Sequence, residues 1–67
     1  MSVAKVIELI GSSQRSFEDA VQNAVDEAAK TVRGISGVWV KGFKAVVANG
    51  EIIEYRSIVK LTFLSGN

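Results

Sequence analysis

The chain has 67 residues, with eight basic and seven acidic side chains and neither cysteine nor histidine. This length allows one small domain over residues 1–67, and the composition excludes disulfides, cysteine-based zinc sites and a histidine general base. The balanced, dispersed charge is not that of a nucleic-acid-binding protein, and the apolar runs fall short of the ~20 residues that span a bilayer.

These limits leave oligomerisation as the expected source of additional stability. A domain of this size buries only about 60% of its unfolded surface, and disulfides, metals or oligomerisation usually compensate for that. The hydrophobic content of 48% is high for so little interior volume. The start of the chain, Met1 to Lys5, does not resemble a signal peptide, so we expect a soluble cytoplasmic protein that associates with itself.

The first predicted element is a strand over Val3–Ile10. Its residues alternate loosely in polarity and are rich in β-branched side chains, as is typical of strands. Gly11, Ser12 and Ser13 follow and predict a loop.

A helix is predicted to begin at Ser16. Serine is a favoured N-cap, and Asp19 three residues later resembles a capping box. Lys30 and Arg33 are expected in the last turn, with Gly34 as the residue that ends the helix. The apolar residues at helical spacing form one stripe for packing on a sheet: Phe17, Ala20, Val21, Ala24, Val25, Ala28, Val32 and Ile35.

Gly37 is expected to interrupt the chain before two further strands, Val38–Ala48 and Glu51–Leu64. Asn49-Gly50 lies between them and is a strong hairpin signal. The order of elements predicts an α+β fold of β-α-β-β type, a three-stranded antiparallel sheet with one helix packed on it. The first strand is expected to pair with the last, which is the longest and most apolar.

Both faces of the last predicted strand carry large apolar side chains. One helix can cover only one face, and the second keeps apolar residues where an antiparallel sheet facing water would be polar: Ile52, Ile58 and Leu64, with Trp39 and Phe43 expected beside them. An exposed tryptophan next to other apolar residues indicates a binding surface. Either a partner subunit or a stacked planar ligand is expected to cover Trp39.

No arrangement typical of an active site stands out, and we expect a protein that is not an enzyme. Serine and threonine hydroxyls lack a histidine to activate them. Glu8, Glu51 and Glu54 are candidates to approach one another at the sheet, and copies related by symmetry would offer oxygen ligands to Ca²⁺ or Mg²⁺. The alternative is that these carboxylates are exposed or form ion pairs with Lys41, Arg56 and Lys60.

The sequence resembles the dodecins along nearly its whole length. Similar segments occur in the same order as the opening strand and loop, the single helix and the final strand of that family: Lys5–Ser13, Ser16–Val21, Ala28–Arg33, Glu54–Arg56 and Val59–Phe63. No single segment is diagnostic, but the combination is specific.

The resemblance implies a β-α-β-β subunit in a hollow homododecamer built from trimers, which would bury the second sheet face. It also implies a protein that stores or sequesters flavins such as riboflavin, FMN or FAD without catalysing a reaction. In that family, flavin pairs stack between tryptophans at a two-fold axis, and a glutamine of the last strand hydrogen-bonds the ring edge.

The sequence departs from the family at these contacts. Aligned on Val40-Lys41, Gly37 occupies the position of the stacking tryptophan, and Trp39 lies two residues later, on the same face but about 7 Å along the strand. Arg56 replaces the glutamine, and its guanidinium only donates hydrogen bonds. Lys44 falls where some members carry a basic residue that meets phosphate.

Three hypotheses follow. The first is a dodecin-like shell with altered or absent flavin binding, which holds another small ligand or an ion. The alternative is a flavin-storing protein in which Trp39 provides the stacking ring. A small enzyme with its site at a subunit junction is disfavoured because histidine and cysteine are absent.

Overall fold

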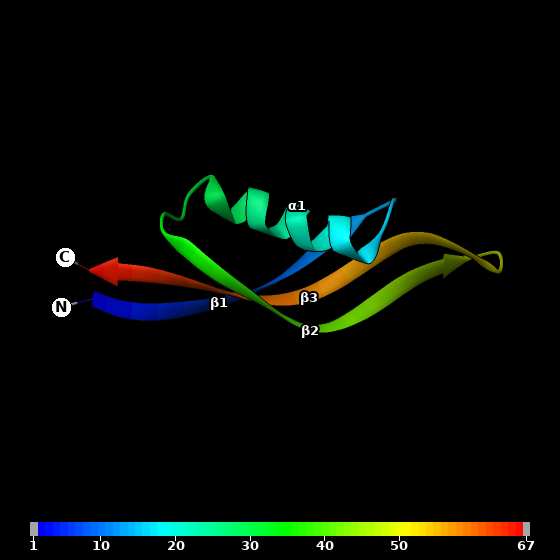
Figure 1. The fold of residues 1–67 in the computed structure, drawn as a ribbon. Helices are drawn as coiled ribbons and strands as arrows, with labels where there is room; N and C mark the ends of the chain where they lie inside the picture. Colours follow the sequence, from blue (N-terminus) through cyan, green and yellow to red (C-terminus); the bar gives the residue numbers. More distant parts are fainter. Residues whose placement is uncertain (1, 67) are drawn as a thin grey trace.

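The computed structural model describes residues 2–66, which form three strands and one helix. The strands β1 (Ser2–Ser13), β2 (Ile35–Ala48) and β3 (Glu51–Gly66) make one antiparallel sheet in the order β1-β3-β2. The helix α1 (Phe17–Ala29) lies across one face of this sheet (Figure 1). The predicted β-α-β-β fold is confirmed, including the pairing of the first strand with the last.

The helix begins where the sequence predicts. The Ser16 side chain accepts a hydrogen bond from the Asp19 backbone N–H at 2.9 Å, which satisfies one free donor of the first turn. The helix buries Ala20, Ala24 and Ala28, and the last two form a core cluster with Val59 and Leu61 of β3. Because these alanines are small, the helix backbone lies close to the sheet.

The expected end of the helix was wrong. The helix ends at Ala29, and Lys30 is its C-cap, so neither Lys30 nor Arg33 lies in the last turn. The Thr31 and Val32 N–H groups still bond to the Ala28 carbonyl, and the chain then turns toward β2. Gly34 has φ 77° and accepts a hydrogen bond from Leu64 N–H, so it joins the turn to the sheet instead of capping the helix.

Two strands extend further than predicted. Gly11, Ser12 and Ser13 do not form a loop but continue β1, paired with Ser57, Arg56 and Tyr55 of β3. Gly37 does not interrupt the chain but lies within β2, which begins at Ile35. Glycine and serine favour turns locally, and pairing with the long strand β3 overrides that preference here.

The hairpin at Asn49-Gly50 is confirmed. Both residues have positive φ, 52° and 77°, which is the backbone that a tight two-residue hairpin requires. On the hairpin side, β2 and β3 extend past the first turn of α1 (Figure 1), and the molecule measures 52 × 20 × 13 Å. A helix of 13 residues is only about 20 Å long, so much of the sheet length has no helix over it.

A register shift in β2 moves one aromatic side chain to the other face. The pairing with β3 slips between Val40 and Gly42, so the residues that follow change parity. Phe43 therefore lies on the helix face, with its ring centroid 4.9 Å from that of Phe17, and the expectation that it joins Trp39 on the opposite face was wrong. Among residues 2–66, no helix is long and apolar enough to cross a membrane.

Candidate functional site on the outer sheet face

The face of the sheet opposite α1, called here the outer face, is rich in exposed apolar side chains. From Glu54 to Leu64 it carries the even-numbered residues of β3 and the residues of β1 and β2 that pair with them. Its large exposed hydrophobic residues come from all three strands: Val6, Ile10, Trp39 and Leu64. Several large apolar side chains exposed on one face of a small domain indicate an interaction site.

Trp39 stands on this face with 63% of its surface exposed. It pairs in register with Lys60, whose Nζ lies 5.4 Å from the centre of the tryptophan ring, a cation–π contact. Gly37 and Gly42 lie before and after it on β2, and a Cβ added to either would meet no atom within 4 Å. The indole therefore has open space on both sides along the strand.

Lys44 and Arg56 face each other in adjacent strands. Like charges directly opposite in a sheet repel, and only Arg56 has an acidic partner among the described ion pairs, Glu54, with Nε 2.6 Å from Oε2. Lys44 is exposed, so this part of the face has an excess of positive charge.

The four residues considered for ligand binding thus share one face but not one pocket. Gly37 pairs with Thr62 and Lys44 with Arg56, six positions apart along β3, which corresponds to about 20 Å. Trp39 lies between them. A ligand held by one chain would contact part of this row, and any site that uses the whole row must be long or include a second copy.

The carboxylates considered as metal ligands lie apart. Glu8 forms an ion pair with Lys41 at 3.3 Å, Glu54 pairs with Arg56, and Glu51 starts β3 beside the hairpin turn. Within residues 2–66 no group of three acidic side chains is placed to hold a metal ion. That these carboxylates come together when several copies of the chain assemble stays a prediction.

The hydroxyls near the start of α1 have structural partners. Ser13 is buried; its Oγ donates to Asp19 Oδ2 at 2.7 Å and accepts from the Arg15 N–H at 2.9 Å. The Ser13 hydrogen bond, with Arg15 nearby, lowers the pKa of the Asp19 carboxyl. Ser57 is fully buried and donates to the Phe17 carbonyl at 2.9 Å. These contacts hold the helix to the sheet.

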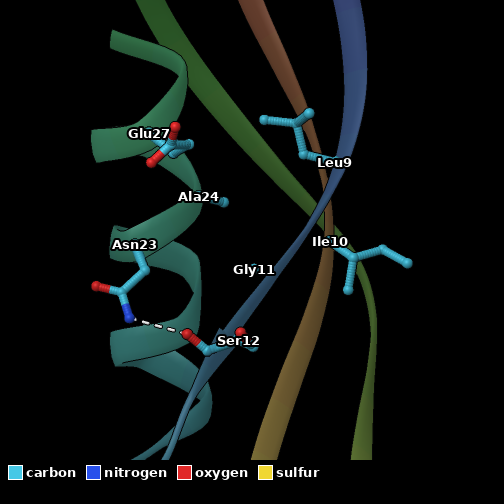
Figure 2. A pocket seen from close by; sticks show the side chains of 7 residues that line it. All are labelled: Leu9, Ile10, Gly11, Ser12, Asn23, Ala24 and Glu27. Atoms are coloured by element: carbon cyan, nitrogen blue, oxygen red, sulfur yellow. Dashed lines mark hydrogen bonds between the residues drawn. The ribbon is translucent and has the colours of Figure 1, made fainter. Parts of the chain in front are cut away.

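A groove between α1 and β1 was not anticipated from the sequence. It has a volume of about 290 Å³ and is bordered by Leu9–Ser12 of β1 and by Asn23, Ala24 and Glu27 of α1. Figure 2 shows that the Ile10 side chain points away from the groove, so Ile10 borders it with its backbone. Asn23 Nδ2 donates to the Ser12 carbonyl at 2.9 Å across one end. Gly11 is the only local signal that the helix approaches here.

Comparison with known proteins gives one consistent result. The dodecin family model matches residues 3–65. A dodecin of Thermus thermophilus is 31% identical over 61 residues, covering 91% of this chain and 88% of the relative. A crystal structure of a Thermus thermophilus protein superposes with TM-score 0.93 at 28% identity, covering 100% and 98% of the two chains. The dodecin of Streptomyces coelicolor superposes with TM-score 0.94 at 26% identity, covering 98% and 94%.

Proposed function

The chain belongs to the dodecin family, and from this we propose that it forms a hollow homododecamer built from trimers, without enzymatic activity. We propose further that this shell sequesters a small ligand or an ion in the cytoplasm, and that its flavin binding is altered or absent.

The apolar outer face is the observation that carries the proposed assembly. Among residues 3–64, the core consists of only five buried apolar residues, three of them alanines: Ala20, Ala24, Ala28, Val59 and Leu61. In contrast, four large apolar side chains are exposed on the outer face, Val6, Ile10, Trp39 and Leu64. Burying one such side chain contributes about 1.5–3 kcal/mol. Covering this face with a neighbouring subunit would therefore add several such contributions to the stability of a chain whose own core is small.

Two residues support the altered flavin binding. Gly37, at the position of the family's stacking tryptophan, has no side chain to place against a ring. Arg56, at the position of the family's glutamine, only donates hydrogen bonds and already pairs with Glu54 at 2.6 Å. The usual ring contacts of the family therefore have no equivalent in these two residues.

The alternative function is flavin storage with Trp39 as the stacking ring. The observation that favours it is the exposed indole with open space beside Gly37 and Gly42. Lys44 would then be available for a phosphate group. Riboflavin, FMN and FAD are the ligands to compare, since only the last two carry phosphate.

Flavin fluorescence and light scattering separate these possibilities. We expect a mass near twelve times 7.2 kDa and little quenching of riboflavin or FMN at stoichiometric protein. A 7.2 kDa monomer would contradict the assembly. Strong quenching that is lost in Trp39→Ala but kept in Trp39→Phe would establish the alternative.

Ion sequestration needs its own measurement. Calorimetric titration of Ca²⁺ and of Mg²⁺ into the assembled protein should give a saturable site that Glu51→Gln weakens, if the carboxylates converge in the assembly. A flat titration for both cations would exclude the ion and leave a small organic ligand.

A further inference from the structure

The two edges of the sheet differ in regularity. β1 and β2 are both edge strands, and an edge presents unpaired backbone N–H and C=O groups. β2 has three register shifts against β3, which twist an edge and interrupt its row of backbone groups. β1 pairs with β3 without any shift over all 12 of its residues. Its free edge is therefore the straighter and more continuous template for another strand.

Hydrogen bonds in the structure show which β1 residues point their backbone outward. Leu64 N–H donates to the Gly34 carbonyl and Ser36 Oγ donates to the Thr62 carbonyl, so the even-numbered residues of β3 face β2. The odd-numbered residues of β3 therefore face β1 and bond to its odd-numbered residues, since each residue of a strand points both backbone groups to one side. The even-numbered residues of β1 are left facing outward, as the bond from Asn23 to the Ser12 carbonyl confirms.

The helix covers only one end of this edge. Asn23 Nδ2 donates a hydrogen bond to the Ser12 carbonyl, and the groove beside this bond reaches the Ile10 backbone (Figure 2). Ala4, Val6, Glu8 and Ile10 lie before that point and are all exposed. No side chain of the described residues is hydrogen-bonded to the backbone of these four.

We infer that β1 pairs antiparallel with β1 of a second copy of the chain, about a two-fold axis near Ile7. This inference rests on the proposed assembly and specifies one of its contacts. A two-fold interface brings the same surface of both copies together, so a straight edge meets an equally straight one. It joins two three-stranded sheets into one of six strands, with the exposed Val6 and Ile10 side chains continuing the outer face from one copy to the next.

Charge disfavours the neighbouring register centred on Glu8. Centred on Ile7, the pairing sets Val6 opposite Glu8 of the second copy, and Ala4 opposite Ile10. A pairing centred on Glu8 would place two identical carboxylates opposite each other, which is destabilising. The Ile7 register also keeps Lys5 opposite an apolar residue, Leu9. No like charges then meet across the new strand pair.

Hydrogen exchange of the assembled wild-type protein tests the inference directly. The amides of Val6, Glu8 and Ile10 are expected to exchange as slowly as those of Ile7 and Leu9, which bond to β3, and on the order of 100-fold more slowly than free edge amides. Rapid exchange of the three outward amides in an assembled protein would overturn the strand pairing and leave the proposed assembly intact.

A proline variant provides the second test. Val6→Pro removes an N–H that β3 does not use, so the sheet tolerates it, whereas the edge loses a donor. Val6→Ala is the matched control, which shortens the same side chain and keeps the N–H. We expect Val6→Pro to stay folded by circular dichroism while its mass falls to about a quarter of the wild-type mass or less, because the two-fold contacts are lost. Val6→Ala should remain assembled.

The opposite outcomes are equally definite. A fully assembled Val6→Pro variant would refute the pairing. Slow exchange at Val38 and Ala45, the outward amides of β2, together with those of Val6 and Glu8, would refute it in favour of β1 pairing with β2 of another copy. A monomeric wild-type protein would refute the assembly and this contact together.

Discussion

The helix face and the outer face of the sheet are built from alternate residues of the same strands. They differ in how far the rest of the chain covers them. On β3, Ser57, Val59 and Leu61 are 0% exposed beneath α1, whereas Leu64 on the outer face is 57% exposed. The outer face nevertheless carries large apolar residues from all three strands. Burial within one chain therefore accounts for only half of the hydrophobic pattern, and the other half indicates contacts with further molecules.

The helix face is itself only partly covered. Near the hairpin, Phe43 lies on the helix face but is 60% exposed, because only the first turn of α1 reaches it. Phe17, at the first turn of α1, contacts Phe43 and Tyr55, with ring centroids 4.9 and 5.0 Å away. The difference between the two faces is thus greatest at mid-strand, beneath the helix.

The largest expected effect is at Gly11, where the helix lies closest to β1. A Cβ at this position would overlap the Ala20 carbonyl oxygen and lie 2.9 Å from the Ala24 Cβ. Gly11→Ala should destabilise the fold by about 3 kcal/mol or more, because the obstacle is helix backbone that cannot move aside locally. Urea unfolding at fixed protein concentration measures this.

Gly37→Ala is the matched control for the outer face. No atom lies within 4 Å of the position of its Cβ, so its effect on unfolding should stay within about 0.5 kcal/mol. Equal destabilisation by the two substitutions would show that the close contact beneath α1 does not limit stability.

The next comparison shortens one leucine on each face. Leu61→Ala removes a fully buried side chain and should cost about 2–5 kcal/mol of unfolding free energy. Leu64→Ala should leave the folding of a single chain nearly unchanged but weaken assembly, since Leu64 lies on the outer face. Urea unfolding combined with light scattering separates the two effects. A Leu64→Ala variant that assembles as tightly as the wild type would exclude Leu64 from the contact.

The smallest expected effect is a pH dependence at the start of α1. The Ser13 hydroxyl, aided by Arg15, lowers the pKa of Asp19 in the folded chain below the ordinary carboxyl value of about 3.9. A lowered folded pKa stabilises the protein above the unfolded value, and this stabilisation is lost as pH falls through the folded pKa.

The Ser13→Ala variant isolates this contribution. Without the hydroxyl, the pKa of Asp19 should rise toward its ordinary value, and stability should depend less on pH below about 4. NMR titration of the Asp19 carboxyl gives the pKa directly, and Ser12→Ala serves as the control. An unchanged Asp19 pKa in Ser13→Ala would assign the shift to Arg15 and Asn23.

The sequence predicted most of the elements because their signals are local. Serine at the N-cap, alanines at helical spacing and Asn49-Gly50 between alternating residues each act within a few positions. The parity of β3 was also predictable, since side chains alternate along a strand whatever pairs with it. The outer position of Trp39 followed from that alternation and is confirmed by its pairing with Lys60.

The errors arose where a distant contact decides the local structure. Gly11–Ser13 and Gly37 read as turn residues but are drawn into strands by pairing with β3. Phe43 changes face because a register shift after Val40 reverses the alternation, and such a shift depends on the partner strand.

The same distinction applies to the candidate site. Placing Trp39 and Arg56 on one face required only alternation and the hairpin register, whereas Lys44 joins them because the register shift after Val40 reverses the alternation. Two side-chain contacts could not be predicted, because side-chain partners depend on the final register. One is the ion pair between Arg56 Nε and Glu54 Oε2 at 2.6 Å, and the other is the contact of Lys60 Nζ with the Trp39 ring. The groove beside β1 was missed because it forms between segments more than ten residues apart.

The sequence by itself determined the order of the elements and the apolar character of both sheet faces. These follow from side-chain periodicity and from the identity of residues at fixed positions. Only the tertiary structure decided where α1 ends, which face Phe43 joins and which edge of the sheet is straight. Those properties depend on pairing across the sheet, where a shift of one residue moves every later side chain to the opposite face.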